Sequence, residues 1–138
     1  MVFVIKEPGL LSTFQDLGRY GFQSTGISPS GALDYESAIL ANQIVGYDIA
    51  EAVIEMQLTR ISFDVLKDTT IGVVGAQMDL TVNGKKTPLG RPIPLAKGDF
   101  VKLGFVKEGM RTYLAAAGGF KLDRVLNSYS FTYEYGWL

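Results

Sequence analysis

Polar side chains that could bind and polarise a carbonyl group gather in a ten-residue stretch near the start of the chain, FQDLGRYGFQ. It holds the amide of Gln15, the carboxylate of Asp16 and the guanidinium of Arg19, with glycines at positions 18 and 21. Arg19 can make a two-pronged contact with a carboxylate or phosphate, and the glycines allow the backbone to approach such a ligand closely. Alternatively, Asp16 and Arg19 pair with each other and only stabilise the loop.

A second polar group lies in PSGALDYESAILAN. Ser30 and Gly31 come just before an expected helix, where free backbone N–H groups attract anions. Asp34 either caps that helix or takes part in catalysis, since Asp is among the commonest capping residues. Asn42 follows two helical turns later on nearly the same face, and a polar group on an otherwise apolar helix face normally needs a buried partner.

The third candidate is Glu55, within the apolar stretch AVIEMQL. In a strand, alternation places Glu55 on the face opposite Ile54 and Met56. One interpretation is a glutamate that points outward into solvent. If this face instead lines the mouth of a barrel, Glu55 becomes a candidate general acid or base.

Two missing residue types limit the chemistry of the chain. With no His and no Cys among the 138 residues, a Ser-His-Asp or Cys-His nucleophile system, a Cys/His zinc site and a disulfide cannot form within this chain. Acid–base chemistry must therefore use Asp, Glu, Lys or Tyr. A metal site made of carboxylates alone stays open, but no DxDxDG-type loop is present, so no metal is expected.

Charge and hydropathy point away from nucleic acid and membranes. The 13 basic and 14 acidic residues are spread along the chain, which predicts no nucleic-acid partner. No apolar run approaches the roughly 18 residues of a membrane span, and MVFVIKEPG lacks the features of a secretory signal. We therefore expect a cytoplasmic protein.

The elements that must position these residues are mostly short strands. Asp34 and Gly46 bound a helix expected over residues 35–45, whose core face holds alanines 38 and 41 with Ile44 and Val45. From residue 52 the apolar period changes to two, through AVIEMQL, RISFDV, TTIGVVGA, MDLTVNG, PIPLAKGDFVKLGFV and RTYLAAAGGF. Tight turns are expected at Asn83-Gly84 and at residues 97–99. The pattern predicts one mainly β domain, a closed or nearly closed antiparallel barrel with one helix.

The last ten residues differ from the rest. YSFTYEYGW alternates aromatic side chains at positions 129 to 137, which would line one face of a strand. We expect a strand or arm that packs on the domain or on a neighbouring copy, which would make a homo-oligomer through this tail. The alternative is a strip for stacking on carbohydrate or bases.

The stretch PGLLSTFQDLGRYGFQSTGISPSGALDYESAILANQIVG resembles the start of the biotin-dependent carboxyltransferase family, which includes allophanate hydrolase subunit 2, the Kip inhibitor antagonist and the C subunit of ATP-dependent 5-oxoprolinase. The family pattern is matched at residues 15, 16, 18, 19, 21, 26, 30–32, 34, 38, 41, 42, 45 and 46. Tyr47 departs from it, because the family usually has Asn there. The resemblance continues through the A-x-x-E stretch at Glu55 and through IGVVGAQMDLTVNGK and GMRTYLAAAGGF.

The resemblance implies a cyclophilin-like antiparallel β-barrel, with a second related subdomain in full-length members. It divides this chain into a cyclophilin-like carboxyltransferase subdomain at residues 1–128 and an atypical aromatic tail at residues 129–138. Because full-length members are more than twice as long, the resemblance also implies a truncated subunit, the N-terminal half of the enzyme.

The implied activity is ATP-coupled opening of an amide or lactam carbonyl, such as that of pyroglutamate, or carboxyl transfer between biotin and urea. Companion subunits are the implied partners, ATP would enter through the whole complex, and biotin is a further implied cofactor. Two alternatives stay open: a regulatory protein that sequesters a kinase inhibitor, as for the Kip antagonist, and an inactive fragment of the enzyme. The residues carried over are Arg19, Asp34 and Glu55 for catalysis, and Gln15, Asp16, Ser30, Gly31 and Asn42 for substrate binding.

Overall fold

The computed structural model describes residues 3–7, 11–18, 32–46, 51–57 and 61–117 of the chain. Its elements follow in the order β1 (Phe3–Glu7), β2 (Leu11–Gln15), α1 (Tyr35–Ile44), β3 (Val53–Gln57), β4 (Ile61–Val65), β5 (Thr69–Val82), β6 (Lys85–Thr87), β7 (Ile93–Leu95) and β8 (Phe100–Ala116). Every strand pairing is antiparallel, and the described part contains one helix. The expected fold class, mainly antiparallel β with one helix near residues 35–45, is confirmed. The aromatic tail lies outside the described residues.

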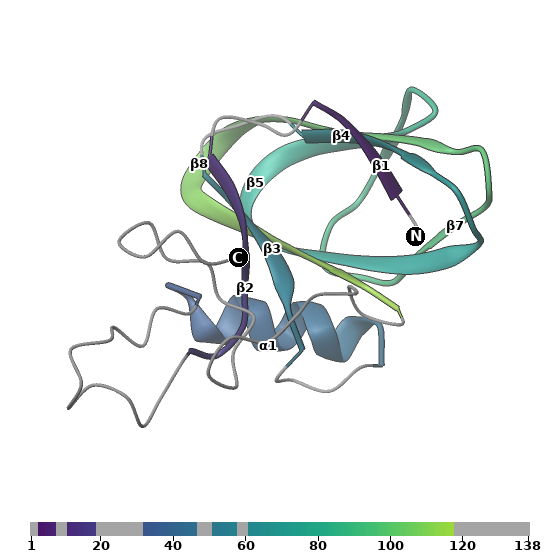
Figure 1. The fold of residues 1–138 in the computed structure, drawn as a ribbon. Helices are drawn as coiled ribbons and strands as arrows, with labels where there is room; N and C mark the ends of the chain where they lie inside the picture. The colour runs from purple at the N-terminus through teal and green to yellow at the C-terminus, as the bar shows by residue number, and fades with distance from the viewer. Residues whose placement is uncertain (1–2, 8–10, 19–31, 47–50, 58–60, 118–138) are drawn as a thin grey trace, which may run out of the picture.

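The sheet is built on two long strands, β5 and β8, which pair from Ile71↔Ala116 to Val82↔Val101. Along its other edge, β8 pairs with β4 through its first part and with β3 through its last part, in the order β1-β4-β8-β3-β2. Both long strands bend strongly, so the sheet curls around its own inner face (Figure 1).

The sequence predicted more and shorter strands than the structure has. TTIGVVGA and MDLTVNG form one strand, and FVKLGFV and RTYLAA form another. Three register shifts in the β5–β8 pair, between Gly75 and Leu80, account for the difference. Such bulges break the alternation of side chains without ending the strand, so the sequence pattern indicates an end where the structure only bends.

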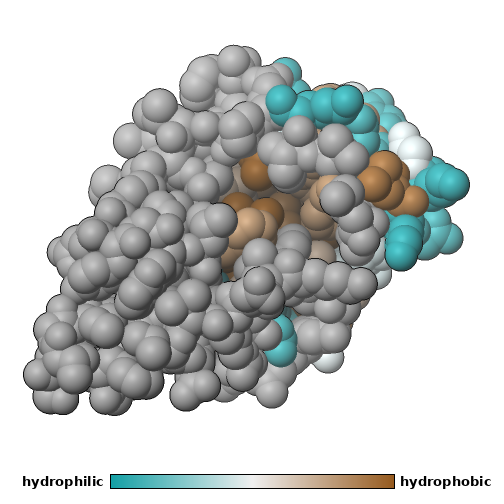
Figure 2. Space-filling model, in the orientation of Figure 1, coloured by the Kyte–Doolittle hydropathy of each residue, from teal (hydrophilic) through white to brown (hydrophobic). Residues whose placement is uncertain are grey.

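The inner face of the curled sheet holds the main core. Its fully buried members come from four strands and alternate with residues of the outer face: Met56, Phe63, Ile71, Val73, Val101, Leu103 and Leu114. The space-filling view shows apolar atoms near the centre of this side of the molecule and hydrophilic atoms at its upper right edge (Figure 2). Burial of this apolar area is the main force that keeps the sheet curled.

Helix α1 lies across the outer face of the sheet, below it in Figure 1. Ala38 and Ala41 are buried against Val53, Tyr113 and Ala115, which confirms the expected core face. Small side chains bring the two backbones so close that a Cβ atom on Gly72 of β5 would lie 2.8 Å from the carbonyl oxygen of Ala41. The helix therefore forms a second, smaller core with the face of the sheet that points away from the main one.

The local signals at turns and helix ends are also confirmed. Asp34 is the N-cap of α1, and Gly46 follows its C-cap with φ +75°. Asn83 and Gly84 both have positive φ in the turn between β5 and β6. The amide of Asp99 donates to the Ala96 carbonyl at 3.0 Å, which closes the turn at residues 97–99. Of the helices that the structure describes, none is long and apolar enough to cross a membrane.

We expect Gly75→Ala to lower the free energy of unfolding by about 2–3 kcal/mol. Gly75 has φ +127°, which L side chains rarely adopt, and a Cβ atom there would overlap the carbonyl oxygen of Arg111 on β8. Urea unfolding followed by circular dichroism measures the change. The matched control is Gly104→Ala, because a Cβ on Gly104 would make an ordinary contact, 3.6 Å from the carbonyl oxygen of Asp79. Equal losses in the two variants would contradict the bulge as the cause.

Candidate functional site

Glu55 and Tyr113 form the centre of the candidate site. The antiparallel register of β3 and β8 places them directly opposite each other, so their side chains leave the same face of the sheet as neighbours. That face is opposite Ile54, as alternation predicted, and it is covered by α1. Glu55 is only 8% exposed and Tyr113 is 0% exposed. Glu55 thus lies beneath the start of the helix, and the alternative of a glutamate that points outward into solvent is not observed.

Four hydrogen-bonding groups meet at this point. The Tyr113 hydroxyl donates to Glu55 Oε2 at 2.7 Å, and the backbone amide of Leu33 donates to the same oxygen at 2.9 Å. The Tyr113 hydroxyl in turn accepts from the backbone amide of Asp34 at 2.9 Å. Glu55 of β3 and Tyr113 of β8 therefore hold Leu33 and Asp34, the two residues directly before α1.

The charge of Glu55 is compensated where it is buried. Arg111, two residues before Tyr113 on the same face of β8, places Nε 3.7 Å from Glu55 Oε1. A buried carboxylate is tolerated when it has such partners. Burial raises the pKa of Tyr113 well above its ordinary value. The hydrogen bond from the Asp34 amide opposes this rise, and the hydrogen bond to Glu55 and the charges of Glu55 and Asp34 add to it. The hydroxyl is therefore protonated at neutral pH and acts as a donor to Glu55.

Asp34 serves as a cap with its side chain and as an anchor with its backbone. Its carboxylate accepts from the Ser37 amide at 3.1 Å and from the Ser37 hydroxyl at 2.7 Å. These hydrogen bonds hold the pKa of Asp34 below its ordinary value. The capping interpretation is confirmed, and the carboxylate is exposed and ionised at neutral pH.

Gln15 and Asp16, at the end of β2, are both buried. The carbonyl of Asp16 accepts from the Ala32 amide at 2.8 Å, one residue before Leu33. Its carboxylate accepts from the Gly18 amide at 2.9 Å. The structure thus brings Asp16, Asp34 and Glu55 to the start of α1 from three separate parts of the chain.

Asn42 lies near the other end of the helix. Its side chain is buried, and Nδ2 donates to the backbone carbonyl of Glu51 at 2.8 Å. This is the buried partner that a polar residue on an apolar helix face required. The contact joins α1 to the segment that leads into β3.

The remaining predicted site residues, Arg19, Ser30 and Gly31, lie outside the described residues, as do Tyr47 and the contact expected between Asp16 and Arg19. Sequence reasoning missed Tyr113 and Arg111. Alternation along RTYLAA places both on one face of a strand, which is a usable signal. Their link to Glu55 depends on the pairing of β3 with β8, which alternation does not reveal.

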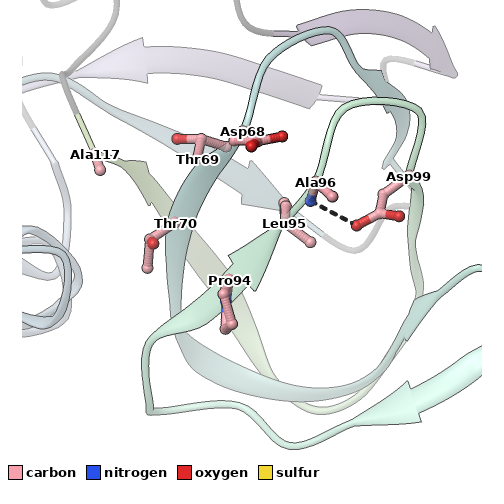
Figure 3. A pocket seen from close by; sticks show the side chains of 8 residues that line it. All are labelled: Asp68, Thr69, Thr70, Pro94, Leu95, Ala96, Asp99 and Ala117. Carbon is pink, nitrogen blue, oxygen red and sulfur yellow. Dashed lines mark hydrogen bonds between the residues drawn. The ribbon is translucent and has the colours of Figure 1, made fainter.

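A separate shallow cavity of about 610 Å³ lies beside the start of β5 and the end of β7 (Figure 3). Residues 68–70, 94–96, 99 and 117 line it, and none of them is a candidate from the sequence. Its two carboxylates are used to close turns: Asp99 Oδ2 accepts from the Ala96 amide and Asp68 Oδ1 from the Lys97 amide, both at 2.8 Å. Within the described ranges, no three acidic side chains are grouped so that they could hold a metal ion.

Comparison with known proteins decides the family. The family model "Carboxyltransferase domain, subdomain A and B" matches residues 25–137. The chain belongs to this carboxyltransferase-domain family. The urea amidolyase of Saccharomyces cerevisiae is 36% identical over 127 residues, which cover 91% of this chain and 7% of the relative. The C subunit of the Escherichia coli 5-oxoprolinase is 33% identical over 126 residues, 91% of this chain and 41% of the relative.

Solved structures of carboxyltransferase-family relatives have the same fold. The crystal structure of the Kluyveromyces lactis urea amidolyase matches with a TM-score of 0.92 and 32% identity, over 94% of this chain and 8% of that one. The urea carboxylase of the same organism matches with a TM-score of 0.91 and 32% identity, over 94% of this chain and 12% of that one. This carboxyltransferase-domain chain spans less than half the length of the curated relatives that it matches.

We expect Asp34→Ala to lower the free energy of unfolding by about 1 kcal/mol at neutral pH, the usual cost of removing a capping aspartate. The pKa of Asp34 is lower in the folded state, so its contribution is fully present above the unfolded pKa and is lost as the pH falls through the folded pKa. The difference from wild type should be constant above about pH 5 and shrink below about pH 4.

Urea unfolding at a series of pH values from 7 to 3 measures this effect. Asp34→Asn is the matched control, because Asn keeps a capping oxygen without the charge and should cost less at pH 7. A stability difference for Asp34→Ala that stays the same down to pH 3 would show that the charged cap does not stabilise the helix.

Proposed function

We propose that this chain is part of a carboxyltransferase-type amidohydrolase that works with companion subunits on an amide or lactam carbonyl such as that of pyroglutamate. The similarity to the C subunit of 5-oxoprolinase and to urea amidolyase, each over 91% of this chain, carries the proposal. Both names indicate substrates with a carbonyl carbon bonded to nitrogen. A companion subunit is proposed because the 5-oxoprolinase relative is itself named as a subunit.

Opening such a bond requires water to add to the carbonyl carbon, negative charge to build on the carbonyl oxygen, and the departing nitrogen to gain a proton. Donors placed where the negative charge develops lower the barrier most. We assign this role to Arg19 with Gln15, and substrate contacts to Asp16, Ser30, Gly31 and Asn42.

Asp34 and Glu55 remain the proposed carboxylates for proton handling. Their positions support this choice, because the Tyr113 hydroxyl binds both the Glu55 carboxylate and the backbone amide of Asp34 at the start of α1.

ATP is proposed to bind a companion subunit. A helix start could attract phosphate through free amides, but the amides of Leu33, Asp34 and Ser37 all donate to groups of this chain. The described residues therefore do not fit a triphosphate at this helix. Biotin, which the family resemblance implies, offers a neutral ureido group, and the side-chain amide of Gln15 is of the type that could bind it.

We expect phosphate release from ATP to rise on addition of pyroglutamate when this chain is combined with the companion subunits encoded in the same genome. In that complex Arg19→Ala should lower the pyroglutamate-dependent rate about 100-fold or more, the usual effect of removing a donor to a developing oxyanion. The matched control is Arg91→Ala, which removes an exposed arginine of the β6–β7 connection and should leave the rate unchanged.

Two results would contradict the proposal in different ways. No response to pyroglutamate by the wild-type complex refutes the assigned substrate, and a response to urea and biotin instead would move the chain to the urea-linked branch of the family. An unchanged rate in Arg19→Ala refutes the assigned site while leaving the activity standing.

A further inference from the structure

The hydroxyl of Tyr113 is the one group that touches both proposed carboxylate residues, among the contacts that the described residues show. It donates to the side chain of Glu55 and accepts from the backbone amide of Asp34. Neither residue is near Tyr113 in sequence, with separations of 58 and 79 positions. The hydroxyl of Tyr113 thus links the two carboxylate residues, beside the direct hydrogen bond from the neighbouring Leu33 amide to Glu55 Oε2.

The support beneath this hydroxyl is rigid. Tyr113 is fully buried, and β8 is paired there on both sides, with Glu55 of β3 and with Val74 of β5. The ring packs in the small core beneath α1 together with Ala38, Ala41 and Ala115. The ring therefore has little freedom to move, and its hydroxyl is held at a fixed point in the sheet.

We propose that Tyr113 is a positioning residue for the proposed reaction, fixing the Glu55 carboxylate and the start of α1 at Asp34 relative to each other. This inference rests on the proposed function, in which both residues handle protons. Tyr113 acts through them and does not itself contact the substrate. Its ring supplies packing, and its hydroxyl supplies the alignment.

If Tyr113 had a purely structural role, removing its hydroxyl alone would have the same effect as removing another buried hydroxyl of the sheet. Ser62 on β4 allows this comparison, because its hydroxyl is also buried but has no hydrogen-bond partner among the described residues. Ser62→Ala removes one buried hydroxyl from the same sheet without removing a contact to either carboxylate residue. Tyr113→Phe removes one hydroxyl and both contacts.

Hydrogen exchange measures the alignment without any assay of activity. In Tyr113→Phe the Asp34 amide loses its acceptor, and its exchange should become about tenfold faster relative to that of the Val65 amide. Val65 is a suitable reference because its amide donates to the Asp99 carbonyl at 2.9 Å, away from this network. In Ser62→Ala the ratio of the two exchange rates should stay at the wild-type value.

Steady-state kinetics of the full complex measures the consequence for the reaction. With misaligned carboxylates, Tyr113→Phe should lower kcat about tenfold or more and change KM for pyroglutamate by less than about twofold, because loss of alignment affects the reacting geometry more than binding. Ser62→Ala should leave kcat and KM unchanged.

A second pair of variants tests the same network from Glu55. Glu55→Gln keeps an oxygen that can accept from the Leu33 amide and the Tyr113 hydroxyl, whereas Glu55→Ala removes it. Exchange at Leu33 should be close to the wild-type rate in Glu55→Gln and about tenfold faster in Glu55→Ala. Equal exchange rates at Leu33 in the two variants would overturn the assigned contact.

The possible outcomes separate the two proposals. Unchanged exchange at Asp34 in Tyr113→Phe overturns the inference, and so does faster exchange with an unchanged kcat. If the wild-type complex has no activity, the proposed function is refuted, and exchange alone decides whether Tyr113 fixes Asp34 and Glu55.

Discussion

A carboxylate buried beneath the first turn of a helix is the constraint on which the arrangement of the site depends. The buried side chain of Glu55 has a partner at each oxygen: the Tyr113 hydroxyl and the Leu33 amide both donate to Oε2, and the Arg111 guanidinium lies near Oε1. Removing a single donor would leave a buried acceptor with fewer partners, which costs more than an ordinary hydrogen bond contributes. The position of the helix, the pairing of β3 with β8 and the charge of Glu55 are therefore coupled.

The two faces of the curled sheet have separate roles. The inner face holds large apolar side chains and supplies most of the burial. The outer face, near the start of α1, has small residues where the helix packs and polar residues where it begins. This division places the candidate site on the helix side of the sheet and not inside the curl, so the proposed chemistry does not require an opening through the main core.

How well each element could be predicted depends on how far apart in the sequence the interacting residues lie. Asp34, Gly46, Asn83 and Gly84 act on backbone within a few residues of themselves, so the sequence alone predicts each of them as a cap or turn residue, as the structure confirms. The strands of 14 and 17 residues were divided in two, because register shifts after Gly75 break the alternation while pairing with the partner strand continues. Only the partner strand shows that the ladder is unbroken.

For the site, the amino-acid sequence is enough to say which residue types are available and on which face of a strand or helix they lie. It marked Asp34 and Glu55 as candidates, required a partner for Asn42, and excluded His and Cys chemistry. Only the tertiary structure decided that α1 covers Glu55, that Asn42 binds the Glu51 carbonyl and that Tyr113 belongs to the site. The physical reason is that period and propensity act along the chain, whereas burial and hydrogen bonding between residues 55 and 113 depend on strand register and on the close packing of a helix.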